Sequence, residues 1–145
     1  MAKNNSKKTR SVAAERKTLL EVTDFSVTEA YKQLRTNIMF AMSAKDSNIV
    51  EFSSSNPGEG KSITSANMAI AIAQTGAKVL LVDFDLRKPV QHRIFSLPNE
   101  KGVSTLLGKM SKYEYTVHRD VTKNLDVITC GPIPPNPSEL LSSHN

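Results

Sequence analysis

The sequence is short of cysteine and of long apolar runs. Its single cysteine, Cys130, cannot form an internal disulfide, which predicts a reducing compartment, the cytoplasm. The longest strongly apolar run, residues 68–73, is far shorter than the about 18 residues that cross a bilayer. Residues 1–17 are polar and lack the apolar region of a signal peptide. Without internal repeats, 39% hydrophobic and 23% charged residues predict a globular domain and exclude a fibrous protein.

Positive charge is concentrated at the start of the chain. The net charge is +5, and residues 1–17 contain six basic side chains and one acidic one, so the rest of the chain is balanced. We expect residues 1–24 to form a basic, disordered leader. Residues 1–17 could also contact an anionic membrane surface, at roughly 1 kcal/mol per basic residue. Nucleic acid would bind this tail weakly and without specificity, so no specific nucleic-acid partner is expected.

Apolar periodicity predicts alternating helices and strands. We expect a helix that begins at Thr28 and ends within 43–47, a strand at 48–53, a helix at 61–75, a strand at 78–83, a short helix at 103–107, a strand at 124–129, an irregular proline-rich loop at 131–137 and the start of a helix at 138–142. Four consecutive apolar residues at 79–82 are typical of a strand buried on both faces in a parallel sheet. Strand, loop, helix and strand over residues 48–83 predict one βαβ unit and an α/β fold.

The loop at residues 55–62, SNPGEGKS, is close to the phosphate-binding pattern G-x-x-x-x-G-K-[ST], with serine in place of the first glycine. Gly58 and Gly60 permit positive φ and a close approach of the backbone to phosphate. Successive amides and the start of the following helix would then face the anion. Lys61 could reach the terminal phosphates, and the Ser62 hydroxyl could bind Mg²⁺. The alternative is a Gly/Pro turn with a solvated lysine, but the position between strand and helix favours phosphate binding.

The second candidate group lies at residues 80–87, LLVDFDLR, where a predicted strand ends. Ligands of open α/β sheets sit at the carboxyl ends of the strands, so Asp83 and Asp85 could approach the same phosphates. One carboxylate could hold Mg²⁺ or its water, and the other could accept a proton from an attacking hydroxyl. Arg87 could contact phosphate or pair with these carboxylates. The alternative is that the acidic residues only form a turn.

Together the two motifs resemble the bacterial tyrosine kinases of capsular and exopolysaccharide synthesis, which are P-loop ATPases of the deviant-Walker group. Residues 80–87 fit the family's A-prime motif, three aliphatic residues followed by D-x-D-x-R, and residues 57–62 match its loop. Residues 87–89 and 131–141 are similar to other segments of the family. The resemblance covers residues 29–142. It implies a P-loop NTPase-like α/β fold, with a mainly parallel sheet flanked by helices.

The resemblance also implies ATP and Mg²⁺ as cofactors and transfer of the γ-phosphoryl group to tyrosine. It assigns catalysis to Lys61, Asp83 and Asp85, with Asp83 as the preferred base. It assigns Mg²⁺ to Ser62, Asp83 and Asp85, and the ATP phosphates to Pro57, Gly58, Glu59, Gly60, Lys61, Ser62 and Arg87.

The first predicted helix resembles the family's oligomerisation motif, E-x-x-R-x-x-R. Glu29 and Arg35 match it, and Lys32 replaces the middle arginine, which keeps the charge but loses the bidentate geometry. The resemblance implies a homo-oligomer, whereas the alternative is an exposed helix with i,i+3 charge pairs. Because the sequence has no membrane span, it also implies a separate membrane-embedded polysaccharide co-polymerase that activates the kinase. That partner would place the chain at the inner face of the cell membrane.

Two family features are not present in the 145 residues: a Walker B strand, expected after Leu141, and a tyrosine-rich tail. We therefore expect residues 25–145 to be the N-terminal part of a P-loop kinase domain, incomplete at the C-terminus, with an exposed sheet edge and impaired catalysis. One alternative is a partition-type ATPase switch, against which Asn56 argues, because those proteins usually have lysine there. The other is a nucleotide-binding fragment without catalysis, which the missing Walker B strand favours.

Overall fold

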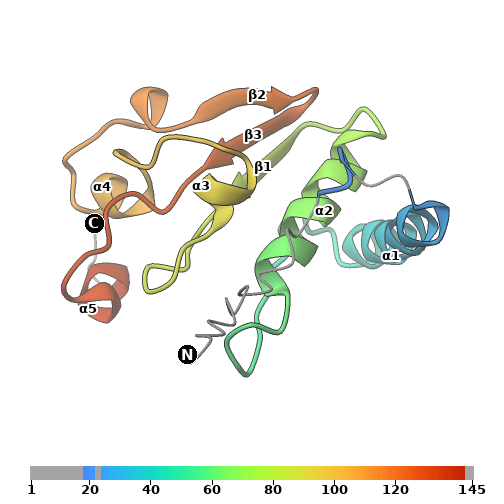
Figure 1. Cartoon of the computed structure of the whole chain (residues 1–145), viewed down its shortest axis with the longest axis horizontal. Helices are drawn as coiled ribbons and strands as arrows, with labels where there is room; N and C mark the ends of the chain where they lie inside the picture. The colour runs from blue at the N-terminus through green and yellow to red at the C-terminus, as the bar shows by residue number, and fades with distance from the viewer. Residues whose placement is uncertain (1–17, 22–23, 143–145) are drawn as a thin grey trace, which may run out of the picture.

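A three-stranded sheet forms the centre of the computed structural model, which describes residues 18–21 and 24–142 (Figure 1). Strand β1 (Val79–Val82) runs parallel to β3 (Leu125–Ile128), with Val79 opposite Leu125 and Val82 opposite Ile128. Strand β2 (His118–Thr122) pairs with the other edge of β3 in the antiparallel direction. The order is thus β1-β3-β2, and β1 is an edge strand among the described residues.

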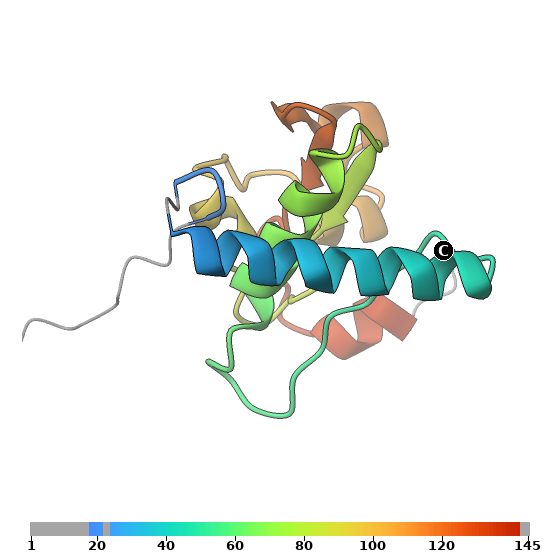
Figure 2. The same cartoon turned by 90° about the vertical axis from the view of Figure 1, so that its right-hand side faces the viewer.

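Helices lie on both sides of this sheet. Helices α1 and α2 lie on one side and α4 and α5 on the other, and α1 crosses in front of α2 in the second view (Figures 1 and 2). The helical segments are α1 (Phe25–Ala44), α2 (Lys61–Ala73), α3 (Gln91–Ile94), α4 (Val103–Leu107), the 3₁₀ helix η1 (Tyr113–Tyr115) and α5 (Pro137–Ser142).

Two apolar clusters fill the spaces on either face of the sheet. The first joins α2 to β3 and consists of Ala69, Ile70, Ala73, Leu125 and Val127. The second joins β3 to α4 and consists of Leu86, Val103, Ile128 and Cys130. Side chains of successive strand residues point to opposite faces, so β3 contributes to both clusters. The predicted α/β fold is confirmed, as are α2, β1, α4 and β3.

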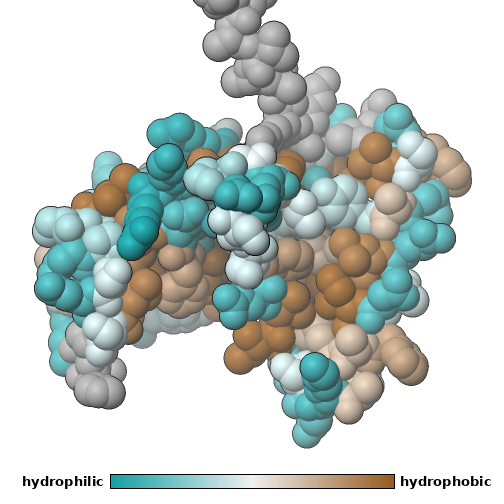
Figure 3. Space-filling view, turned by 90° about the horizontal axis from the view of Figure 1, so that it is seen from below, coloured by the Kyte–Doolittle hydropathy of each residue, from teal (hydrophilic) through white to brown (hydrophobic). Residues whose placement is uncertain are grey.

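Helix α1 begins three residues earlier than predicted. The Asp24 side chain accepts a hydrogen bond from the Ser26 amide (Oδ1···N 2.8 Å) and so caps the helix at its N-terminus. The helix buries none of its residues, and Phe25 and Phe40 are each 78% exposed. Apolar side chains of this kind interrupt the polar surface of the molecule (Figure 3).

The strand predicted at residues 48–53 is wrong. The segment pairs with no strand of the described residues, and Ile49 is 84% exposed. An apolar sequence forms a strand only beside a partner that accepts its backbone hydrogen bonds. The predicted βαβ unit is therefore present only as α2 and β1. Strand β2 and helix α3 were not predicted, and Pro137 belongs to α5 rather than to the preceding loop, because proline is tolerated in the first helical turn.

Most of the predicted leader, residues 1–24, lies outside the described residues. Residues 18–21 are described and form a turn against α2, where the Leu19 amide donates to Asn67 (N···Oδ1 2.9 Å). The Leu19 side chain packs against the apolar cluster beside α2. Among the described residues, no helix combines the length and hydrophobicity that a bilayer crossing requires.

Candidate functional site

The glycine-rich loop has the backbone conformation that its sequence predicts. Gly58 and Gly60 have φ of 83° and 91°, in the left-handed region that favours glycine. An added Cβ would meet nothing within 4 Å at Gly58 and only ordinary contacts at Gly60, so conformation rather than space requires glycine here. Gly60 is the N-cap of α2 and provides no side-chain acceptor. The first amides of α2 therefore lack a side-chain cap, which suits an anion at this helix end.

An ion pair joins this loop to the end of β1. Lys61, the first residue of α2, donates to Asp85 across 2.8 Å (Nζ···Oδ2), and the two side chains are 28% and 27% exposed. The other Asp85 oxygen accepts the backbone amides of Arg87 (3.3 Å) and Lys88 (2.9 Å). Burial alone would raise the pKa of Asp85, but the hydrogen bonds from Lys61 and from these amides hold it below its usual value. Asp85 is therefore ionised at neutral pH.

Asp83 lies directly after β1 and is only 6% exposed. Its Oδ1 accepts the Asp85 amide and its Oδ2 accepts the Gln91 amide, each at 3.1 Å. The carboxylate thus closes the turn from residue 83 to residue 91. An ionised carboxylate has about four acceptor positions, so two remain for other ligands.

The predictions did not include Gln91, which links both halves of the site. Its Nε2 donates to the Ser62 carbonyl and to the Ser65 hydroxyl, each at 3.0 Å, and its own amide holds Asp83. The residue is 4% exposed. No motif or spacing in the sequence distinguishes this glutamine.

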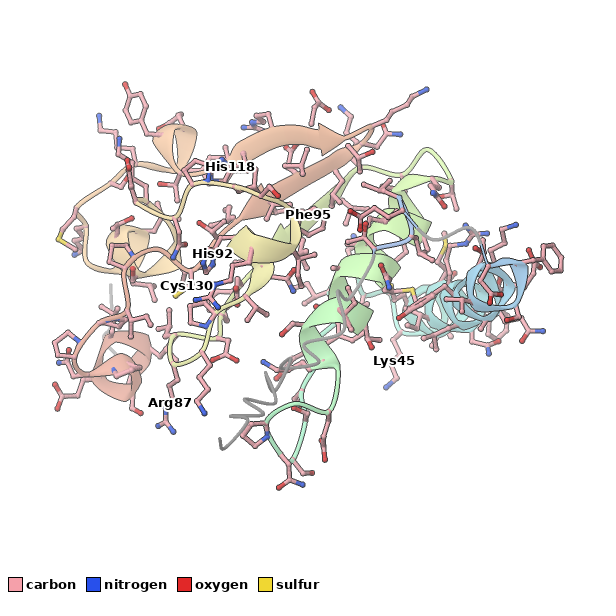
Figure 4. All side chains as sticks on the ribbon, in the orientation of Figure 1. Lys45, Arg87, His92, Phe95, His118 and Cys130 are labelled. Carbon is pink, nitrogen blue, oxygen red and sulfur yellow. The ribbon has the colours of Figure 1, made fainter. Side chains whose placement is uncertain are left out.

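Other residues predicted for phosphate contacts lie at the outside of the site. The Glu59 carboxylate accepts the Asn56 side-chain amide (Nδ2···Oε1 3.1 Å), and this bond lowers the pKa of Glu59. Its charge would repel phosphate, so Glu59 is suited to bracing the loop rather than to contacting an anion through its side chain. The exposed Arg87 side chain extends away from its loop (Figure 4), and Pro57 is exposed.

The residues of the predicted oligomerisation motif do not all face solvent. Lys32 and Glu29 form an exposed ion pair on α1 (Nζ···Oε1 2.7 Å). Arg35 instead points to α2, where Nη1 donates to the Ala71 carbonyl at 2.8 Å. Arg35 therefore holds the two helices together within one chain.

The pKa of the buried Cys130 thiol responds to the negative charge of the site. Burial raises the pKa of Cys130 to about 11, and the negative charges of Asp83 and Asp85 add to this effect. A thiol with this pKa stays protonated at neutral pH, so Cys130 packs as a small apolar residue (Figure 4).

The candidate metal donors of this site suit Mg²⁺ better than a metal ion whose ligands all come from protein. In the part of the chain that the structure describes, no three His, Cys, Asp or Glu side chains gather around one point. Mg²⁺ typically takes one or two carboxylates and completes its shell with water and substrate phosphates. Asp83, Asp85 and the Ser62 hydroxyl are donors of this kind.

Residues 52–128, more than half of the chain, match the family described as the CobQ/CobB/MinD/ParA nucleotide binding domain. The chain belongs to this family. It is 52% identical over 115 residues to the tyrosine-protein kinase YwqD of Bacillus subtilis (strain 168), covering 79% of this chain and 48% of that protein. The chain thus spans about half the length of this relative.

Solved structures extend the similarity to the fold. The kinase domain of the Escherichia coli tyrosine kinase ETK is 39% identical and superposes with a TM-score of 0.75, covering 79% of this chain and 45% of that chain. The crystal structure of the chimerical protein CapA2B2 is 47% identical with a TM-score of 0.69, covering 79% of this chain and 50% of that chain. The resemblance to bacterial tyrosine kinases is confirmed, and the chain has a P-loop nucleotide-binding fold.

Proposed function

We propose that this chain is the nucleotide-binding part of an ATP-dependent protein-tyrosine (auto)kinase that regulates capsular or exopolysaccharide synthesis. The observation that supports it most is the Lys61–Asp85 ion pair. It brings the glycine-rich loop and the A-prime carboxylates to one place, in a chain that is 52% identical to a tyrosine-protein kinase.

The loop and α2 are proposed to bind the ATP phosphates. The positive-φ glycines turn the backbone so that amides can face an anion, and the start of α2 adds its positive dipole end. Lys61 would exchange its Asp85 partner for phosphate oxygens, which carry more charge. Ser62, Asp83 and the released Asp85 are the proposed Mg²⁺ ligands, and the ion would neutralise charge on the phosphates.

We propose Asp83 as the group that accepts the proton of the attacking tyrosine hydroxyl. Asp85 is the weaker candidate for the base, because Lys61 already holds its carboxylate beside the phosphate-binding loop, where it suits Mg²⁺ and the phosphates. Two backbone amides fix the Asp83 carboxylate in place, which orients its remaining lone pairs without further reorganisation.

ATP binding by the full chain with Mg²⁺ tests the site. A hydrogen bond to a charged group contributes about 1.5–3 kcal/mol, so Lys61→Met should weaken ATP affinity roughly 10- to 100-fold. Lys88→Met is the matched control, because Lys88 contacts Asp85 through its backbone amide, which the substitution leaves in place. Equal affinity in wild type and Lys61→Met would contradict the assignment.

Label from γ-labelled ATP distinguishes the reaction. Protein-bound phosphotyrosine supports the kinase, and its loss in Asp83→Asn supports the proposed base. Release of free phosphate alone would instead indicate an ATPase switch. ATP binding with neither product would leave a nucleotide-binding module without catalysis, and would contradict the proposed reaction.

A membrane-embedded polysaccharide co-polymerase as activator, a homo-oligomer and a position at the inner face of the membrane are proposed from the resemblance. On α1, Glu29 and Lys32 are the motif residues whose charged groups are exposed to a second copy. Light scattering of the chain and of Glu29→Lys tests the oligomer. A monomer at all concentrations would contradict it.

A further inference from the structure

Gln91 is a buried polar residue that contacts both halves of the site. Its main-chain amide holds the Asp83 carboxylate, and its side chain holds Ser62 and Ser65 in the first turns of α2. The Ser65 hydroxyl in turn donates to the Ser62 carbonyl at 2.9 Å. One residue therefore ties the backbone of the proposed Mg²⁺-binding serine to the proposed Mg²⁺-binding aspartate.

The orientation of the Gln91 amide follows from its partners. The Ser62 carbonyl can only accept, so the group 3.0 Å from it must be the NH₂ and not the oxygen. The Oε1 then faces away, is buried, and has no hydrogen-bond partner among the described residues. A buried acceptor without a donor destabilises a fold, and an apolar side chain of similar size would avoid this cost. The feature that distinguishes glutamine from such an apolar side chain is therefore the pair of hydrogen bonds that it donates to Ser62 and Ser65.

We propose that Gln91 is a positioning residue that couples nucleotide binding to Mg²⁺ by fixing the Ser62 turn of α2 against the Asp83 carboxylate. This inference rests on the proposed function. Mg²⁺ demands a nearly ideal octahedral arrangement, so its binding depends on the spacing of its few protein ligands more than phosphate binding does. Among the described residues, loss of the Gln91 side chain would leave Ser62 held through α2 and Asp83 through its own turn.

The experiment measures ATP affinity of the full chain by calorimetry, with Mg²⁺ and with EDTA. The ratio of the two dissociation constants gives the coupling between cation and nucleotide. Gln91→Met keeps the volume and removes both polar atoms. Its ratio should fall about fivefold or more, within the range of coupling energies between contacting groups, while affinity in EDTA changes less than about twofold. The thermal midpoint should change little, because the removal of the unpaired oxygen offsets the loss of two donated hydrogen bonds.

Asn67→Leu is the matched control. Asn67 is a buried amide on the same helix, but it holds the Leu19 amide and not the site. It should lower the thermal midpoint and leave the coupling ratio unchanged. Gln91→Glu is a second variant, in which an oxygen replaces the NH₂ beside the Ser62 carbonyl, and it should reduce the ratio at least as much as Gln91→Met.

The outcomes separate this inference from the proposed function. An unchanged ratio in both Gln91 variants, or equal losses of affinity with and without Mg²⁺ together with a lower midpoint, would overturn the positioning role while wild type still binds ATP. If wild type does not bind ATP, the proposed function and this inference both fail. If Gln91→Met does not fold, the result for Gln91→Glu decides.

Discussion

The segments on either side of the site, residues 83–91 and residues 48–60, hold their shapes in different ways. After β1, the carboxylates of Asp83 and Asp85 each accept two backbone amides, and Asp85 also pairs with Lys61. Polar contacts within the chain therefore fix the carboxylate half of the site.

The segment before α2 depends on conformation and on short-range contacts. The Ser54 hydroxyl donates to the Asn56 carbonyl at 3.2 Å, and Asn56 donates to Glu59, so these bonds span at most three residues. Ile49 upstream has no strand partner in the described chain and is exposed. The comparison indicates that the carboxylate half is preorganised, whereas the phosphate-binding half takes its shape from glycine and from the start of α2.

Among changes in the two segments that flank the site, removal of the Asp83 carboxylate should have the largest effect on stability. Asp83→Leu leaves the buried Gln91 amide and the Asp85 amide without an acceptor, which should lower the free energy of unfolding by about 2–4 kcal/mol. Glu51→Gln, in the exposed segment before α2, should change it by less than about 0.5 kcal/mol. Urea unfolding measures both, and similar values for the two variants would contradict the difference between the segments.

Gly60→Ala should have the next largest effect. Alanine in the left-handed region costs about 1–2 kcal/mol, and Gly60 has φ of 91° with room for the methyl group. Stability should fall by about this amount, and ATP affinity should fall as well if the backbone changes to relieve the strain. Unfolding and calorimetry test this on one sample. Full stability together with full ATP affinity would show that the loop conformation is not required.

The elements around the site differ in how well the sequence predicts them. The glycine pattern, the apolar run of β1 and the aspartates that follow it are local signals. They are sufficient to predict the loop, α2 and β1, but not the ion pair between Lys61 and Asp85. Local signals fail where a neighbouring strand determines whether a segment forms a strand. Residues 48–53 are apolar enough for a strand but have no partner in the described chain, and β2 is a strand because β3 lies beside it.

Gln91 and Arg35 illustrate a second limit. Each makes its contact across a distance in sequence, Gln91 to Ser62 and Arg35 to Ala71, and a polar residue at such a position looks like any surface residue. The family resemblance implies that Glu29, Lys32 and Arg35 form an oligomerisation motif. In the structure, Arg35 instead donates to the Ala71 carbonyl of α2, because the two helices pack against each other there.

The Lys61–Asp85 pair should make a smaller contribution that depends on pH. The folded state lowers the pKa of Asp85 from 3.8, so its stabilisation is present above this value and is lost as pH falls through the lower folded pKa. Partial exposure limits the effect to about 1 kcal/mol or less at pH 7. Asp85→Asn should therefore be less stable than wild type at pH 7, with a difference that shrinks below about pH 4. A difference that grows in acid would have the wrong sign.

Ile49→Thr should have the smallest effect. At 84% exposure the side chain loses almost no burial, so the free energy of unfolding should change by less than about 0.5 kcal/mol. Ile70→Ala, in the cluster beside α2, should cost about 2–5 kcal/mol. A cost of more than about 1 kcal/mol for Ile49→Thr would show that residues 48–53 are packed against a partner.

Hydrogen exchange of the full chain with and without Mg²⁺ and ATP tests most directly whether the two segments form one site. We expect nucleotide to slow exchange of amides in both residues 57–62 and residues 83–91, with the larger gain in residues 57–62, because residues 83–91 are already hydrogen-bonded. Protection confined to one segment, or absent from both while ATP is bound, would contradict a shared site.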